Sequence, residues 1–148
     1  MPSPQSVRAR AKEIQLEHCA ALGPVEYHSR MMHPFIHDQD LLVIDRVTFE
    51  QVRVGDIITY REKEKFPTWR VIRKESNRLV LRPDNYWVLY CAVPEDVLGR
   101  VVERRRGDHR LTAEQWQWKA YARWVLLRHK LGCVKDWYKR RRQRAPHS

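Results

Sequence analysis

A chain of 148 residues has room for one domain with a substantial core, and not for two. Its hydrophobic fraction of 43% and its six Trp exclude a disordered chain. The formal charge of +11 is unevenly distributed, because residues 119–144 contain ten Lys or Arg and one acid. The C-terminal segment therefore carries most of the positive charge, and the rest of the chain is nearly neutral.

The first segment, residues 1–24, is predicted to be a helix. Ser3 can cap it, Pro4 fits its first turn, and Gly23-Pro24 ends it. It lacks the apolar stretch of a signal peptide, and no run in the chain approaches the ~20 apolar residues of a spanning helix. We therefore expect no transmembrane segment and a cytoplasmic location, either free or peripheral to a membrane.

Three widely spaced Cys show no zinc-binding spacing, which favours reduced thiols. His28, His33 and His37 match neither a helix face nor a known zinc pattern, and we interpret them as loop residues. No metal and no cofactor are expected.

The middle segment, residues 25–104, is predicted to be a β domain. Short runs rich in β-branched and aromatic residues alternate with turn signals such as Gly55-Asp56 and Pro83-Asp84-Asn85. These runs cover residues 41–44, 57–60, 69–72, 79–81, 86–91 and 97–102. Connections this short leave no room for crossover helices, so the sheet should be largely antiparallel. The fold class is mainly β (α+β), with a helix on either side of the sheet domain.

The last segment, residues 105–148, is predicted to be a basic, Trp-rich helix and tail. Thr112 and Gln115 form a capping box. One apolar stripe then recurs at helical spacing: Trp116, Ala120, Trp124, Leu127, Leu131, Val134 and Tyr138. Three interpretations stay open: the stripe docks on the sheet, the helix contacts nucleic acid, or it lies at a membrane interface. The candidate polyanion-binding residues are Lys139, Arg140, Arg141, Arg142 and Arg144.

Residues 25–102 resemble the peptidase domain of the signal-peptidase/LexA-like superfamily of serine–lysine peptidases. The family's nucleophile box, Gly-x-Ser-Met-x-Pro, is similar to residues 29–34, where Met32 and Pro34 match, and Asp40 matches the following acid. Three later boxes follow in order. They are Val-Gly-Asp-Ile-Ile-Thr-Tyr at 54–60, Trp-Arg-Val-Ile at 69–72 and Leu-Gly-Arg-Val-Val at 98–102, with the Pro-Asp-Asn turn at 83–85 between the last two. The resemblance implies a coiled antiparallel sheet.

The same resemblance places the family's serine at Met31 and its general base at Trp69. A thioether cannot form the acyl ester, and an indole offers only an N–H donor. We therefore expect a catalytically inactive protein that acts in binding or regulation, with a peptide, a protein partner or a polyanion as ligand. The two replacements either fill the former cleft or line a hydrophobic groove formed by Met31, Met32, His33, Pro34 and Trp69.

The rival hypothesis is an active serine peptidase with an unusual nucleophile. Ser29 is the nearest hydroxyl, two residues before Met31. On a strand the two side chains would share a face but stand about 6.6 Å apart, which does not reproduce the family geometry.

Overall fold

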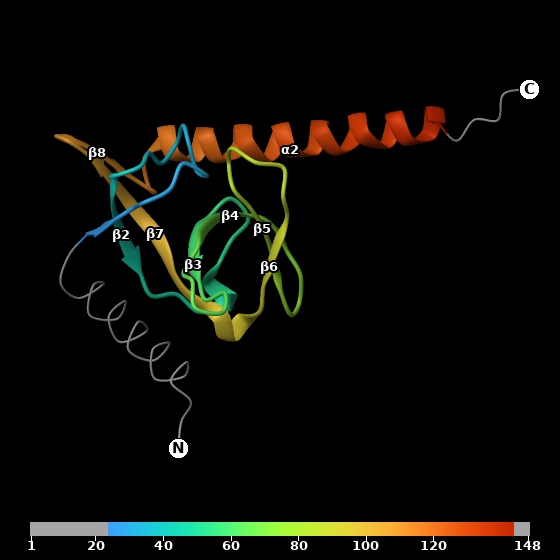
Figure 1. Ribbon diagram of the computed structural model, residues 1–148. Coiled ribbons are helices and arrows are strands. Elements are labelled where there is room, and N and C mark those ends of the chain that lie inside the picture. The colour runs from blue at the N-terminus through green and yellow to red at the C-terminus, as the bar shows by residue number, and fades with distance from the viewer. Residues whose placement is uncertain (1–23, 144–148) are drawn as a thin grey trace, which may run out of the picture.

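A computed structural model describes residues 24–143 of the chain (Figure 1). The helix predicted over residues 1–24 lies outside the described residues except for Pro24, as does Arg144 of the basic tail. The strands are β1 (Val25–Glu26), β2 (Leu41–Asp45), β3 (Ile57–Tyr60), β4 (Thr68–Lys74), β5 (Leu79–Arg82), β6 (Tyr90–Ala92), β7 (Val97–Arg106) and β8 (His109–Thr112). Two 3-10 helices, η1 (Phe49–Gln51) and η2 (Pro94–Asp96), and one long helix, α2 (Trp116–Gln143), complete the elements of residues 24–143.

The strands form one curled sheet in the order β1-β2-β7-β3-β4-β5-β6, with β8 paired to β7. Every pairing is antiparallel, as the short connections predicted. β7 is the longest strand and pairs with β2, β3 and β8. Gly99 of β7 meets β2 so closely that a Cβ there would stand 2.6 Å from Ile44 Cγ2. The expected mainly β fold class is confirmed.

The core lies on the concave side of the sheet. Apolar residues of β3, β4 and β5 meet Met32, Phe35 and Ile36 from the β1–β2 connection, and Trp118 from α2 completes the cluster. The predicted capping box does not cap the helix: the Thr112 backbone N–H donates to Gln115 Oε1 at 2.8 Å, but Thr112 ends β8 and α2 begins at Trp116. α2 crosses one end of the sheet and its C-terminal part projects beyond it (Figure 1).

Two parts of the sheet differ from the sequence-based expectation. The run at residues 86–91 contributes only β6, because residues 86–89 form an exposed connection. Conversely, the expected C-terminal segment from residue 105 begins in a β-hairpin, where β7 continues to Arg106 and turns into β8. Gly107, with φ of +54°, makes that turn possible and was the signal for it in the sequence.

Buried charge marks the junction between the sheet and α2. Arg70 of β4 is fully buried and donates to both carboxylate oxygens of Asp84, at 2.8 and 2.7 Å, and to Gly55 O at 3.0 Å. The rings of Phe35 and Tyr121 lie 5.1 and 5.5 Å from its guanidinium carbon. The pair therefore ties β4, the β5–β6 connection and α2 together.

Candidate functional site

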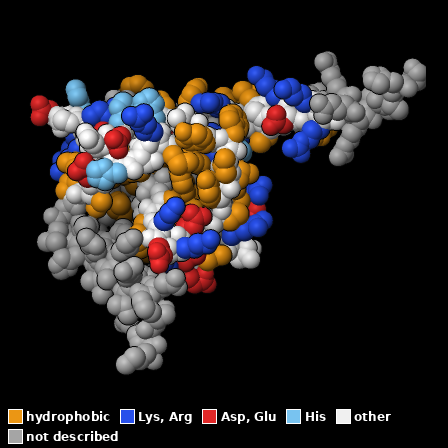
Figure 2. Space-filling view, in the orientation of Figure 1, with side chains coloured by type: hydrophobic (Ala, Val, Ile, Leu, Met, Phe, Trp, Pro, Cys, Tyr) orange, Lys and Arg blue, Asp and Glu red, His pale blue; other side chains and the backbone are white. Residues whose placement is uncertain are grey.

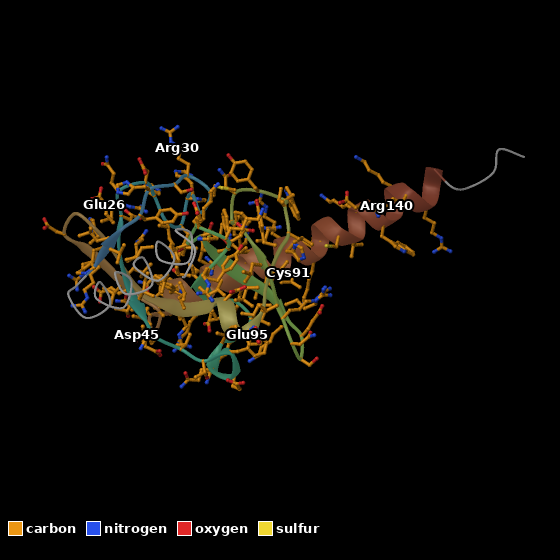
Figure 3. All side chains as sticks on the ribbon, turned by 60° about the horizontal axis from the view of Figure 1, so that its bottom comes forward. Glu26, Arg30, Asp45, Cys91, Glu95 and Arg140 are labelled. Carbon is orange, nitrogen blue, oxygen red and sulfur yellow. The ribbon has the colours of Figure 1, made fainter. Side chains whose placement is uncertain are left out.

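A cavity of about 390 Å³ opens between β1, β2 and the connection from β3 to β4. Its apolar wall is formed by Val25, Leu42, Ile44, Phe66, Pro67 and Trp69. Its polar lining comes from Glu26, Tyr27, His28, Ser29, Thr59, Lys65 and Thr68. Glu26 is labelled in Figure 3 on β1, the outer strand of the sheet. The cavity thus adjoins a strand that, within residues 24–143, pairs on one side only.

Ser29 lies in this cavity, and among the described residues its hydroxyl has no basic hydrogen-bond partner. Its Oγ accepts from the backbone N–H of Met31 at 3.2 Å, and it hydrogen-bonds with the hydroxyl of Tyr27. Burial raises the pKa of Tyr27, and the nearby Asp84 carboxylate adds to this effect. Tyr27 therefore stays protonated at neutral pH and cannot take the proton of Ser29.

Trp69 forms the floor of the cavity and is 7% exposed. Its indole N–H donates to Tyr60 Oη at 3.1 Å, and its ring stacks on Tyr90 at a centroid distance of 5.1 Å. Burial is the main cause that raises the pKa of Tyr60, so this phenol also stays neutral. Trp69, at the position that the resemblance assigns to the general base, is therefore a neutral indole held by these contacts.

The other residues of the predicted groove lie elsewhere. Met31 packs against the edge of the core without lining the cavity, and its carbonyl accepts from Asn85 N at 3.0 Å. Met32 is completely buried, and its sulfur accepts from Asp84 N at 3.4 Å. His33 and Pro34 are exposed, and the ring centroids of His33 and His37 lie 4.5 Å apart in a stacked contact.

Of the five predicted groove residues, Trp69 alone lines the cavity.

The sequence interpretation missed most of the lining residues, and Lys65 is the one among them that carries an amine. It lies in the β3–β4 connection, where its backbone pairs with Glu62. Its side chain is exposed, whereas the serine–lysine mechanism needs a desolvated amine. The only sequence signal was the charged turn at residues 62–65, which is typical of a solvated loop.

The apolar stripe of α2 does not dock on the sheet, and that interpretation is wrong. Trp116 is 73% exposed and Leu127 is 56% exposed, and Trp124, Leu131 and Val134 are exposed to a similar degree. A different side of the helix faces the sheet, formed by Trp118, Ala122 and Val125, which are all buried. The helix sequence has apolar residues on two sides, and the side with the more regular spacing is exposed.

The described part of the basic tail continues α2. Lys139, Arg140 and Arg141 are exposed, and the Arg141 guanidinium carbon lies 5.0 Å from the Trp137 ring centroid. Arg140 is labelled on the projecting end of the helix in Figure 3. Arg142 belongs to the same helix. None of these basic residues lines the cavity, so any polyanion site here would be separate from it.

Within residues 24–143, no group of three or more His, Cys, Asp or Glu is placed to hold a metal ion. The same range contains no helix with the length and apolar character to cross a bilayer. No protein-family model matches the chain, and no curated protein matches it.

Proposed function

We propose that this protein is a non-catalytic binding protein, a degenerate relative of the signal-peptidase/LexA-like peptidases, that accommodates an extended peptide segment. The supporting observation is the cavity beside β1, which combines an apolar wall with a strand that, among the described residues 24–143, pairs on one side only. An extended peptide gains main-chain hydrogen bonds by adding to such an edge and specificity by placing alternate side chains in a pocket. The ligand would be a free peptide or an extended segment of a partner protein.

Among residues 24–143, Ser29 has no hydrogen-bond partner that can take its proton, and this favours a binding role over hydrolysis. Its hydrogen-bond partners are a backbone N–H and a phenol held neutral by burial. The buried ring of Trp69 offers a surface for an apolar ligand side chain. The same features that disfavour acyl transfer therefore favour retention of an uncleaved peptide.

The binding proposal is tested with a displayed library of linear peptides selected on the intact protein. We expect selected peptides to carry apolar residues at alternate positions, because alternate side chains of an added strand face one side. Val25→Arg places a charge in the apolar wall and should weaken those peptides by about tenfold or more. Val93→Arg, on an exposed apolar residue outside the cavity, is the matched control and should bind normally. Equal binding by both variants would place the peptide site elsewhere.

A second candidate, serine peptidase activity at Ser29, rests on one observation: Ser29 and Lys65 line the same cavity. A fluorophosphonate probe distinguishes the two functions. The binding proposal expects no covalent labelling of the wild-type protein. Labelling that is lost in both Ser29→Ala and Lys65→Ala would establish the enzyme and overturn the proposal.

A further inference from the structure

Helix α2 has two apolar sides, and the fold uses one of them. Trp118, Ala122 and Val125 pack against the sheet domain. The second side, which we call the outer stripe, consists of Trp116, Trp124, Leu127, Leu131 and Val134. Each residue of the outer stripe is at least half exposed. A helix that turns large apolar side chains to water over five turns marks an interaction surface.

Basic residues border the outer stripe on both flanks. Arg123, Lys130 and Arg141 recur at spacings of seven and eleven, which return to one side of a helix. Arg128, Lys135 and Lys139 occupy the other flank by the same reasoning. All six are exposed, and Asp136 is the one acid in α2. The surface is therefore apolar along its centre and cationic along its edges.

The β5–β6 connection widens this surface. Residues 86–89 are all about half exposed, and Figure 2 shows hydrophobic side chains gathered over this connection beside α2. Trp87 shares a cavity of about 350 Å³ with Trp124, Leu127 and Leu131. Gly132 permits this approach, because a Cβ there would stand 2.4 Å from Trp87 Cη2. The guanidinium of Arg128 lies 5.7 Å from the Trp87 ring and 5.5 Å from the Trp124 ring.

We propose that the outer stripe and the β5–β6 connection bind the surface of a lipid bilayer that carries anionic headgroups, with α2 parallel to the membrane plane. Trp and Leu side chains enter the boundary between headgroups and acyl chains, where amphipathic aromatic rings are favoured. The flanking Lys and Arg side chains reach outward to lipid phosphates, since their long stems follow an apolar surface while the charge stays hydrated.

Two other partners fit this surface less well. Nucleic acid would engage the basic flanks but would leave Leu127, Leu131 and Val134 in water. A second copy would cover the apolar centre, but a symmetric contact would bring two strongly cationic helices together. An anionic bilayer satisfies the apolar centre and the cationic edges at once.

The test is co-sedimentation of the intact protein with vesicles of phosphatidylcholine alone and of phosphatidylcholine with phosphatidylglycerol. We expect binding to the anionic vesicles that weakens by about fivefold for each basic flank residue changed to Gln. Leu127→Gln with Leu131→Gln removes apolar contact without changing charge and should reduce the binding by about tenfold or more. The matched control is Val54→Gln with Val93→Gln, two exposed apolar residues outside the surface, which should leave binding unchanged.

Three results would overturn the proposal. The first is no sedimentation with anionic vesicles at low salt. The second is full binding by the Leu127→Gln, Leu131→Gln protein together with equal affinity for single-stranded RNA, which would show a general polyanion site. The third is a dimer in sedimentation velocity that the same double variant dissociates, which would make the stripe a contact between copies. Thermal unfolding of each variant verifies that the fold is intact.

Discussion

The two apolar sides of α2 meet different surroundings. Beneath the helix, Arg70, Arg82 and Asp84 are buried, whereas above it tryptophans and leucines face solvent. Arg70 binds Asp84, whereas Arg82 lies 4.3 Å from the Trp87 ring and contacts His129 Nδ1 at 3.2 Å, and among the described residues its buried Nε has no hydrogen-bond partner. On the outer stripe, the Trp124 ring lies near Tyr121 and Arg128, yet each residue of the stripe stays at least half exposed. The lower side packs the helix against the sheet, and the upper side is the surface that we propose binds a membrane.

The largest effect is expected at the buried ion pair. Asp84→Ala leaves the Arg70 guanidinium without its counterion in a dry site, and should lower the free energy of unfolding by about 3–5 kcal/mol. Urea denaturation measures it. Glu114→Ala removes one partner of the exposed pair with Lys119 and should change the stability very little. Arg70→Met combined with Asp84→Leu should cost less than Asp84→Ala alone, and a larger loss would mean that the pair itself stabilises the junction.

A smaller difference should separate the two apolar sides of α2. Val125→Ala removes buried methyl groups and should cost about 1–2 kcal/mol, because the space left behind cannot fully collapse. Leu127→Ala should stay within about 0.5 kcal/mol of the parent, because that side chain already contacts water. Both values come from the same denaturation series. Equal losses at the two positions would show that the outer stripe is covered in the free protein.

The smallest effect is a pH dependence at the junction. Burial, with the nearby charges of Arg82 and Arg73, holds the pKa of His129 below its usual range. As pH falls, the unfolded chain binds this proton before the folded protein does, so stability present at neutral pH is lost as pH drops through the folded pKa. His129→Gln should therefore show a shallower loss of stability between about pH 7 and about pH 5.

The matched control for that measurement is His109→Gln, which changes an exposed histidine of β8. Its stability should follow the parent across the same pH range. If the His129→Gln and parent curves run parallel, His129 does not contribute to the pH dependence of folding.

Five of the six predicted sheet segments follow from local chemistry. Runs such as Ile57–Tyr60 combine β-branched residues with adjacent turn signals, and these determine strands without tertiary information. The run at residues 86–91 carries the same signal, but its first part is exposed and Trp87 packs against Gly132 of α2. A contact between positions so distant in sequence could not be predicted from either segment alone.

The candidate site was predictable in part. Trp69 and Ser29 were both identified from the nucleophile and base boxes, and both line the cavity. Met32 was expected in the groove but lies in the core, because its segment folds back beneath the sheet. For α2, periodicity detected an apolar stripe but could not decide whether it or the side that carries Trp118 meets the sheet. That choice depends on the shape of the sheet surface, which the helix sequence does not contain.

The unbroken length of α2 has a geometric consequence. The helix runs from Trp116 to Gln143 without interruption at Gly132, and its final eleven residues extend about 16 Å past that glycine. β1, which borders the cavity, lies at the opposite end of the molecule from this projection (Figure 1). The helix is thus a rigid spacer, and the packing of Trp118 and Val125 sets the angle between its outer stripe and the cavity mouth. If α2 is bound to a surface, the cavity mouth is held at a fixed distance from that surface and faces a fixed direction.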